Sequence, residues 1–149
     1  MKKFNFEIID GYRNNGQKLE QSVRYALTGA IVKADNIPAT IASDCNGYQI
    51  KSARATIASH DGTKEPANTA NKRAQIIAGW LVHDVARAYI YATADGTAYV
   101  MDVDEYLTFT ANFSTVTRDS AKNGGRYKVR LRYETATMRE WLENQCAGA

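Results

Sequence analysis

An Asn46-Gly47 pair between two β-prone segments is the feature that most constrains how this chain folds. The segments on either side, 40–44 and 49–58, favour strands by composition. Asn-Gly readily adopts the positive φ angles of a two-residue type I′ turn, so the pattern predicts a β-hairpin. If Asn46 and Gly47 form the turn, Asp44 faces Gln49 across the two strands.

The predicted hairpin gathers polar side chains on one face. Directly opposed residues have Cβ atoms about 5 Å apart, and side chains alternate along a strand, so Lys51 shares the face of Asp44 and Gln49. A carboxylate, an amide oxygen and the backbone carbonyl of Ile50 are oxygen ligands that suit Mg²⁺. A metal polarises a phosphate and lowers the pKa of bound water, and a neighbouring lysine positions or deprotonates the attacking water. This set favours phosphodiester hydrolysis, against the alternative of a solvated surface hairpin.

The string Asp44, Gln49, Ile50, Lys51 resembles the signature of the PD-(D/E)XK nuclease superfamily. In that family an acidic residue ends one strand, and the (D/E)XK triplet lies on the next. Many members carry a further glutamate on the first core helix, and Glu20 has the matching place here. The resemblance implies a restriction-endonuclease-like core and a catalytic set of Glu20, Asp44, Gln49 and Lys51. It also implies Mg²⁺ or Mn²⁺ bound by Glu20, Asp44, Gln49 and the Ile50 carbonyl. Gln49 replaces the family's acidic residue, and Ser43 its proline.

Periodicity along the rest of the chain predicts a single α/β (α+β) domain, a central mixed sheet flanked by helices. Helices are expected at 17–28, 69–86, 102–113 and 135–145, and further strands at 31–33, 88–92, 98–101, 114–118 and 126–133. The core-facing residues expected on the first and last helices are Leu19, Val23, Tyr25, Leu27, Met138, Trp141 and Leu142.

Basic residues alternate with apolar or aromatic residues in the segment 126–133. As a strand, this segment presents Arg126, Lys128, Arg130 and Arg132 on one face, which favours contact with nucleic-acid phosphates. The alternative is the solvated outer face of an edge strand, where cations discourage aggregation. Lys72 and Arg73 begin the helix expected at 69–86, and they either contact phosphate or are simply exposed.

Size and composition narrow the remaining classes. The chain has 149 residues, a net charge of +3, two well-separated cysteines and no apolar run of membrane-spanning length. Together with the resemblance, these features lead us to expect a cytoplasmic, Mg²⁺-dependent DNA endonuclease of restriction, phage or mobile-element type. It would act on double-stranded DNA as a homodimer or higher oligomer. Two alternatives remain open: a nuclease-fold protein that binds nucleic acid without cutting it, and a phage or plasmid protein-interaction module.

Overall fold

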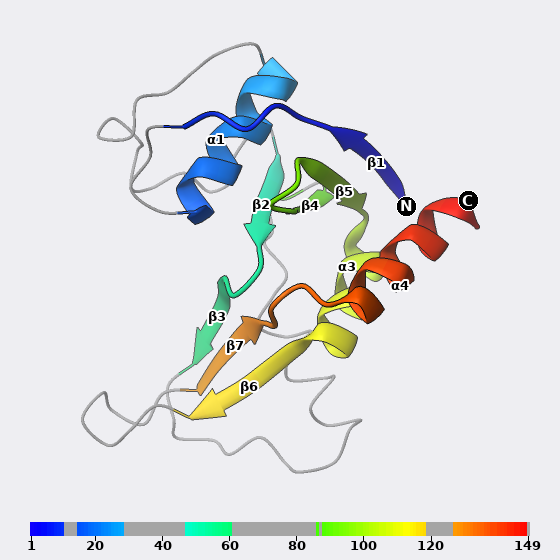
Figure 1. Ribbon diagram of the computed structural model, residues 1–149. Helices are drawn as coiled ribbons and strands as arrows, with labels where there is room; N and C mark the ends of the chain where they lie inside the picture. Colours follow the sequence, from blue (N-terminus) through cyan, green and yellow to red (C-terminus); the bar gives the residue numbers. More distant parts are fainter. Residues whose placement is uncertain (11–14, 29–46, 61–85, 87, 119–126, 149) are drawn as a thin grey trace.

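The computed structural model describes residues 1–10, 15–28, 47–60, 86, 88–118 and 127–148. These residues form a mixed α/β structure with two sheets and three helices, which confirms the expected fold class (Figure 1). The elements are β1 (Lys2–Asn5), α1 (Asn15–Thr28), β2 (Tyr48–Ser52), β3 (Thr56–His60), β4 (Ala88–Ala92), β5 (Thr97–Met101), α3 (Val103–Phe113), β6 (Ser114–Arg118), β7 (Tyr127–Leu131) and α4 (Ala136–Ala147).

The larger sheet has four described strands in the order β1-β5-β4-β2. Strand β4 pairs antiparallel with β5, which pairs antiparallel with β1. Strand β2 pairs parallel with β4, with Ile50 opposite Ile90. The sheet is therefore mixed, as the sequence predicts, although the short β1 strand was not expected.

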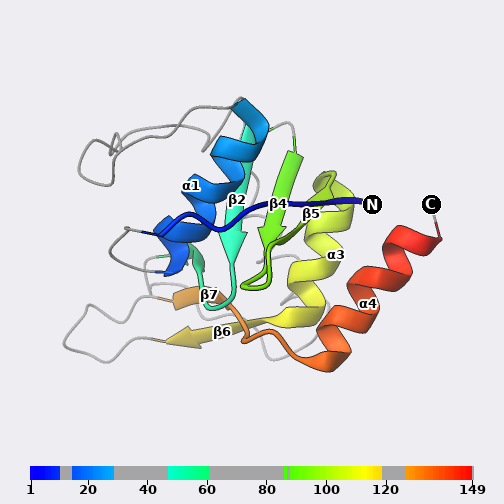
Figure 2. The same cartoon turned by 45° about the horizontal axis from the view of Figure 1, so that its top comes forward.

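Two apolar cores cover the two faces of the larger sheet. Helix α1 buries Leu19 and Val23 against Ile50 and Ile90 on one face. On the other face, tyrosines of β4 and β5 pack against α3, α4 and the inner residues of the smaller sheet. Figure 2 shows α1 on one side of β2 and β4, with α3 and α4 grouped apart from it. The larger sheet thus forms the middle layer of the molecule.

The turn between β4 and β5 depends on Gly96. Gly96 has φ +89°, and its carbonyl accepts a hydrogen bond from the Phe6 backbone at 2.8 Å. A Cβ atom built on Gly96 would lie 2.6 Å from the Phe6 carbonyl oxygen. Glycine is thus required both by the backbone conformation and by the approach of the N-terminal segment. The turn joins β4 and β5, which match the strands expected at 88–92 and 98–101.

The prediction of a single long strand at 49–58 is wrong. The segment divides into β2 and β3, which belong to different sheets. The chain bends between them, where the Ala55 amide donates to the Ser52 carbonyl at 3.1 Å and Arg54 adopts φ +63°. No glycine, proline or asparagine marks this bend, so the sequence carries no turn signal at the point where the chain changes sheet.

Each described helix has its expected position, with small differences in detail. Asp102 caps α3 through a capping box with Glu105, and Thr135 caps α4. The inward positions Leu19, Val23, Met138 and Leu142 are buried, and Trp141 packs against the core. Tyr25 and Leu27, also expected to face the core, are exposed because they lie away from the sheet-facing stripe of α1.

Candidate functional site

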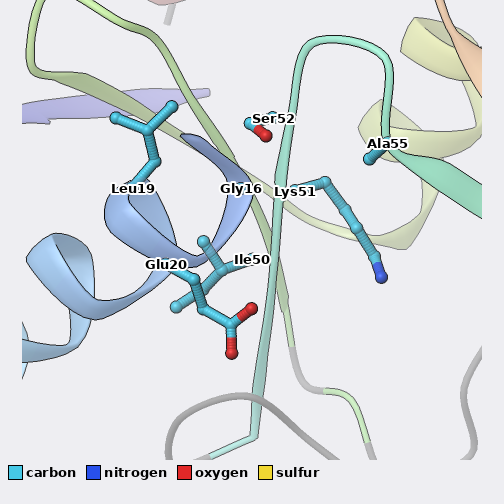
Figure 3. A pocket seen from close by; sticks show the side chains of 7 residues that line it. All are labelled: Gly16, Leu19, Glu20, Ile50, Lys51, Ser52 and Ala55. Atoms are coloured by element: carbon cyan, nitrogen blue, oxygen red, sulfur yellow. The ribbon is translucent and has the colours of Figure 1, made fainter. Parts of the chain in front are cut away.

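A pocket of about 130 Å³ lies between α1 and β2. It is lined by Gly16, Leu19, Glu20, Ile50, Lys51, Ser52 and Ala55 (Figure 3). The volume is enough for several water molecules or one phosphate group, so the rest of a larger ligand would have to lie outside it. Three predicted site residues, Glu20, Ile50 and Lys51, therefore line one pocket.

Two features of the local backbone favour anions at this position. The lining residues of α1 come from its first two turns, and the first turn contains no acidic residue to offset the positive end of the helix dipole. The lining residues of β2 come from its carboxyl-terminal half, beside the parallel strand β4. Ligands of α/β sheets commonly bind beyond the carboxyl ends of parallel strands.

Glu20 and Lys51 approach the pocket from different elements. The Ile50 side chain packs into the core beneath α1 and is 4% exposed, so strand alternation directs Lys51 to the opposite face of the sheet. Figure 3 accordingly shows Glu20 and Lys51 on either side of β2, with both charged ends extending toward the bottom of the view. Both residues are half-buried, which leaves each of them accessible from solvent.

Gln49 occupies a different environment from Lys51. It is 4% exposed and lies in register with the buried Tyr89 of β4. It is absent from the pocket lining, although the hairpin geometry predicted that it would share a site with Lys51. Asp44 and its strand lie outside the described residues, so the predicted pairing of Asp44 with Gln49 remains a prediction.

The donor groups at the pocket are compatible with a hard divalent cation. Mg²⁺ is usually bound by one or two carboxylates together with water, and Glu20 supplies one carboxylate here. Within the described residues, no cluster of three or more His, Cys, Asp or Glu side chains is placed to bind a metal ion. The described part of the site thus offers one acidic ligand, with Asp44 as the predicted second.

The basic strand is only partly as expected. Strand β7 contains Lys128 and Arg130 on the face opposite the buried Val129 and Leu131, which confirms the alternation. However, β7 lies between β3 and β6, so the alternative reading of an edge strand is wrong. Lys128 and Arg130 are half-buried, and Arg132 follows the strand and is exposed. Lys72, Arg73 and Arg126 lie outside the described residues.

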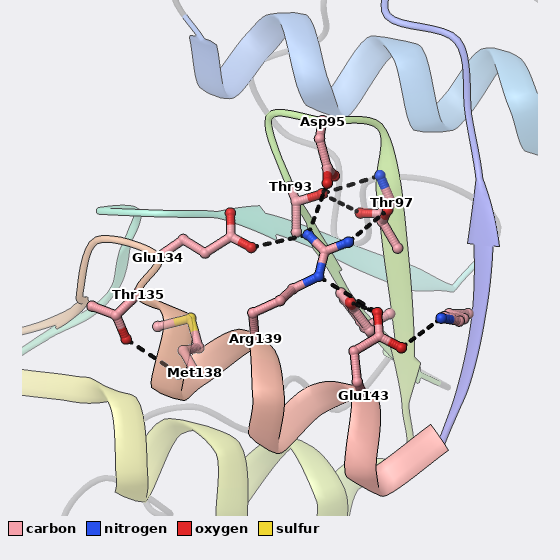
Figure 4. Close-up of polar contacts among 10 residues, drawn as sticks. Thr93, Asp95, Thr97, Glu134, Thr135, Met138, Arg139 and Glu143 are labelled. Atoms are coloured by element: carbon pink, nitrogen blue, oxygen red, sulfur yellow. Dashed lines mark hydrogen bonds and ion pairs between the residues drawn. The ribbon is translucent and has the colours of Figure 1, made fainter. Parts of the chain in front are cut away.

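A second polar cluster joins α4 to the larger sheet (Figure 4). Arg139 forms ion pairs with Asp95 and Glu134 at 3.1 Å and donates to the Thr97 hydroxyl. A hydrogen bond from Thr93 and the nearby Arg139 guanidinium keep the pKa of Asp95 below its usual range. These groups satisfy one another, so the cluster is best explained as a clamp that fixes α4.

Sequence reasoning did not assign the small residues that shape the pocket to the site. Gly16, Ser52 and Ala55 carry little chemistry of their own, but their short side chains leave the space between α1 and the bend after β2. The one weak sequence signal was that Gly16 and Glu20 lie four positions apart on one helix, and therefore on the same face. No sequence signal marked the bend itself, because the bend arises where the chain passes from one sheet to the other at Arg54.

The chain matches no family model, curated protein or solved structure. In the part of the chain that the structure describes, no helix is long and apolar enough to cross a membrane.

Proposed function

We propose that this protein is a Mg²⁺- or Mn²⁺-dependent endonuclease that hydrolyses phosphodiester bonds in double-stranded DNA. The observation that supports this most is the pocket that Glu20 and Lys51 line together, beside the amino end of α1. Such a reaction needs a carboxylate to hold a cation and positive charge to bind a phosphate. Glu20 supplies the carboxylate, and the positive end of the α1 dipole and Lys51, from the other side of β2, supply the positive charge. The proposal includes a restriction-endonuclease-like core, with Asp44 completing the site.

Each residue has a defined part in the proposed reaction. The Glu20 carboxylate and Asp44 hold the cation, which supplies charge neutralisation and an acidified water when bound. The Lys51 ammonium group binds a non-bridging phosphate oxygen and helps to position the attacking water. The positive end of the α1 dipole stabilises negative charge on the phosphate. Gln49, being buried, positions β2 beside β4 and does not reach the pocket directly.

The proposal of double-stranded DNA as the partner is based on positively charged residues at the surface. Lys128 and Arg132 belong to the basic segment that includes β7, and a duplex binds such surfaces mainly through its phosphates. Cutting both strands with so small a unit favours a homodimer or higher oligomer, with each subunit cutting one strand. A cytoplasmic location fits a DNA substrate of this kind.

Cleavage of supercoiled plasmid tests the proposal. In the presence of Mg²⁺ the wild-type protein should convert supercoiled DNA to nicked or linear forms, and addition of EDTA should stop this reaction. Glu20→Gln should lower the rate at a fixed Mg²⁺ concentration and recover partly as Mg²⁺ is raised, because it weakens cation binding. Glu140→Gln removes a carboxylate from an exposed position on α4 and is the matched control. No cleavage at any concentration of Mg²⁺ or Mn²⁺ would contradict the proposal.

A second candidate function is DNA binding without cleavage. It is favoured by Gln49, which lacks the charge of the usual acidic residue and is buried away from the pocket. Retardation of duplex DNA that weakens steeply with salt, without any metal-dependent nicking, would select this function.

A further inference from the structure

Arg54 and Tyr133 form a stacked pair at the surface. The Arg54 guanidinium carbon lies 4.2 Å from the centroid of the Tyr133 ring, and an Arg54 nitrogen donates to the Tyr133 hydroxyl. Tyr133 is nevertheless 63% exposed, the largest value among the exposed large hydrophobic residues that the structure describes. An exposed aromatic ring held in a fixed orientation by a cation is a flat surface available to a ligand.

The backbone at Arg54 is strained. Arg54 is the non-glycine residue with positive φ in the described chain, at +63°. A side chain in this left-handed region is disfavoured, and such residues concentrate at functional sites. Glycine would remove the strain, but arginine stands here and its guanidinium lies over Tyr133. The conformation therefore places a charged, planar group where a simple turn does not require one.

The backbone links this pair to the Glu20–Lys51 pocket. Ala55, the next residue after Arg54, lines that pocket, and its carbonyl accepts a hydrogen bond from the Leu131 amide at 3.0 Å. This bond fixes the end of β7, and with it Tyr133, against the bend that carries Arg54. Arg132, between Leu131 and Tyr133, is exposed and adds positive charge beside the pair.

We infer that Arg54 and Tyr133 form a stacking platform for the base of an unpaired nucleotide whose phosphate enters the Glu20–Lys51 pocket. This inference rests on the proposed function and adds that the duplex is opened at the cut site, so that one base leaves the stack. A pocket of about 130 Å³ is too small for a whole nucleotide, so a base whose phosphate lies beside Lys51 has to lie outside it, next to the bend that carries Arg54. Bases stack on aromatic rings and on arginine with little dependence on sequence, and Lys51, Arg54 and Arg132 complement the phosphates.

Binding of a single-stranded oligonucleotide that contains 2-aminopurine tests the platform, because the fluorescence of this base falls when it stacks. Measured in EDTA to prevent cleavage, the wild-type protein should quench the probe. Tyr133→Ala should weaken binding by about 5- to 150-fold and remove the quenching, as loss of one base stack does. Tyr133→Phe keeps the ring and should retain both. Tyr25→Ala removes another exposed tyrosine, on α1, and should leave binding unchanged.

A second variant guards against an effect on folding. Arg54→Gly suits the positive φ angle, so it should unfold at the same or higher urea concentration than the wild type while losing part of the quenching. Plasmid cleavage measured alongside separates the two proposals. Cleavage by the wild type, together with normal probe binding by Tyr133→Ala and Arg54→Gly, would overturn the platform alone. Neither cleavage nor probe binding by the wild type would overturn both.

Discussion

Gly96 shows at the scale of one residue how the N-terminal segment is fixed to the larger sheet. We expect Gly96→Ala to destabilise the protein by about 1–3 kcal/mol, because it adds a strained φ and a Cβ contact with the Phe6 carbonyl. Gly148→Ala is the control, since its Cβ would lie 3.4 Å from the nearest atom and its backbone is right-handed helical. Urea denaturation measures both variants. If Gly96→Ala and Gly148→Ala unfold at the same urea concentration, Gly96 is not required by the turn.

Single residues also mark where sequence reasoning stops. The Asp95-Gly96 turn was predictable because glycine after aspartate carries a strong local signal. Arg54 was not, because a positive φ at arginine is enforced by contacts with Tyr133 and by the change of sheet, both of which are long-range. Glu20 and Lys51 were predictable as candidates from residue type and spacing, but their common pocket depends on how α1 packs on β2.

At the scale of elements, β7 differs most from its expected role. Its alternating pattern correctly predicted a strand with one buried face, since a period of two is a local property. Its place between β3 and β6 was not available from the pattern, because strand order is decided by pairing between distant segments. The same reason explains why β1 was missed: Lys2–Asn5 is short and polar, and it becomes a strand by pairing with β5.

The position of β7 refines the expected effect of its cations on DNA binding. Arg132→Ala should reduce affinity for duplex DNA and lower the log–log salt slope by about 0.9, because an exposed cation that contacts a phosphate releases condensed counterions. Lys128→Ala should add a similar change. Lys2→Ala removes an exposed cation on β1, an edge strand of the larger sheet, and is the control. If Lys2→Ala and Arg132→Ala change the slope equally, DNA does not follow β7.

Arg130 should behave differently from its neighbours. It is half-buried, and its Nε atom is buried without a hydrogen-bond partner among the described residues. Its substitution therefore combines changes in packing and in charge, and it is less informative about phosphate contact than Arg132.

At the scale of the whole molecule, ion pairs join elements from the two ends of the sequence. The Lys3 ammonium donates to the Glu143 carboxylate at 2.5 Å, and the Tyr99 hydroxyl donates to the same carboxylate at 2.6 Å. These contacts connect β1, β5 and α4, and the hydrogen bond from Lys3 is the largest cause of the lowered pKa of Glu143. A carboxyl group with a lowered pKa in the folded state stabilises the protein only while it is ionised.

We predict a pH-dependent effect of Glu143→Gln on stability. The wild-type contribution is present above the ordinary carboxyl pKa of 4.5 and is lost as pH falls through the lower folded value. Glu143→Gln should therefore cost up to about 1 kcal/mol at pH 7, a modest amount for exposed pairs, and much less near pH 3. Urea denaturation at both values measures this. Glu140→Gln, on the same helix, is the control and should change stability little at either pH. If the destabilisation by Glu143→Gln is the same at both pH values, ionisation of Glu143 does not contribute to stability.

Cleavage of supercoiled plasmid in Mg²⁺ by Lys51→Met and Lys2→Met is the most direct test of the proposed active site. Both changes remove one lysine from the larger sheet, but Lys51 lines the pocket and Lys2 lies on β1. We predict that Lys51→Met lowers the cleavage rate by about 100-fold or more, as loss of a group that handles a proton or stabilises phosphate charge does. Asp44→Ala should do the same, while Lys2→Met should cleave at the wild-type rate. Wild-type cleavage by folded Lys51→Met would show that this pocket is not the catalytic centre.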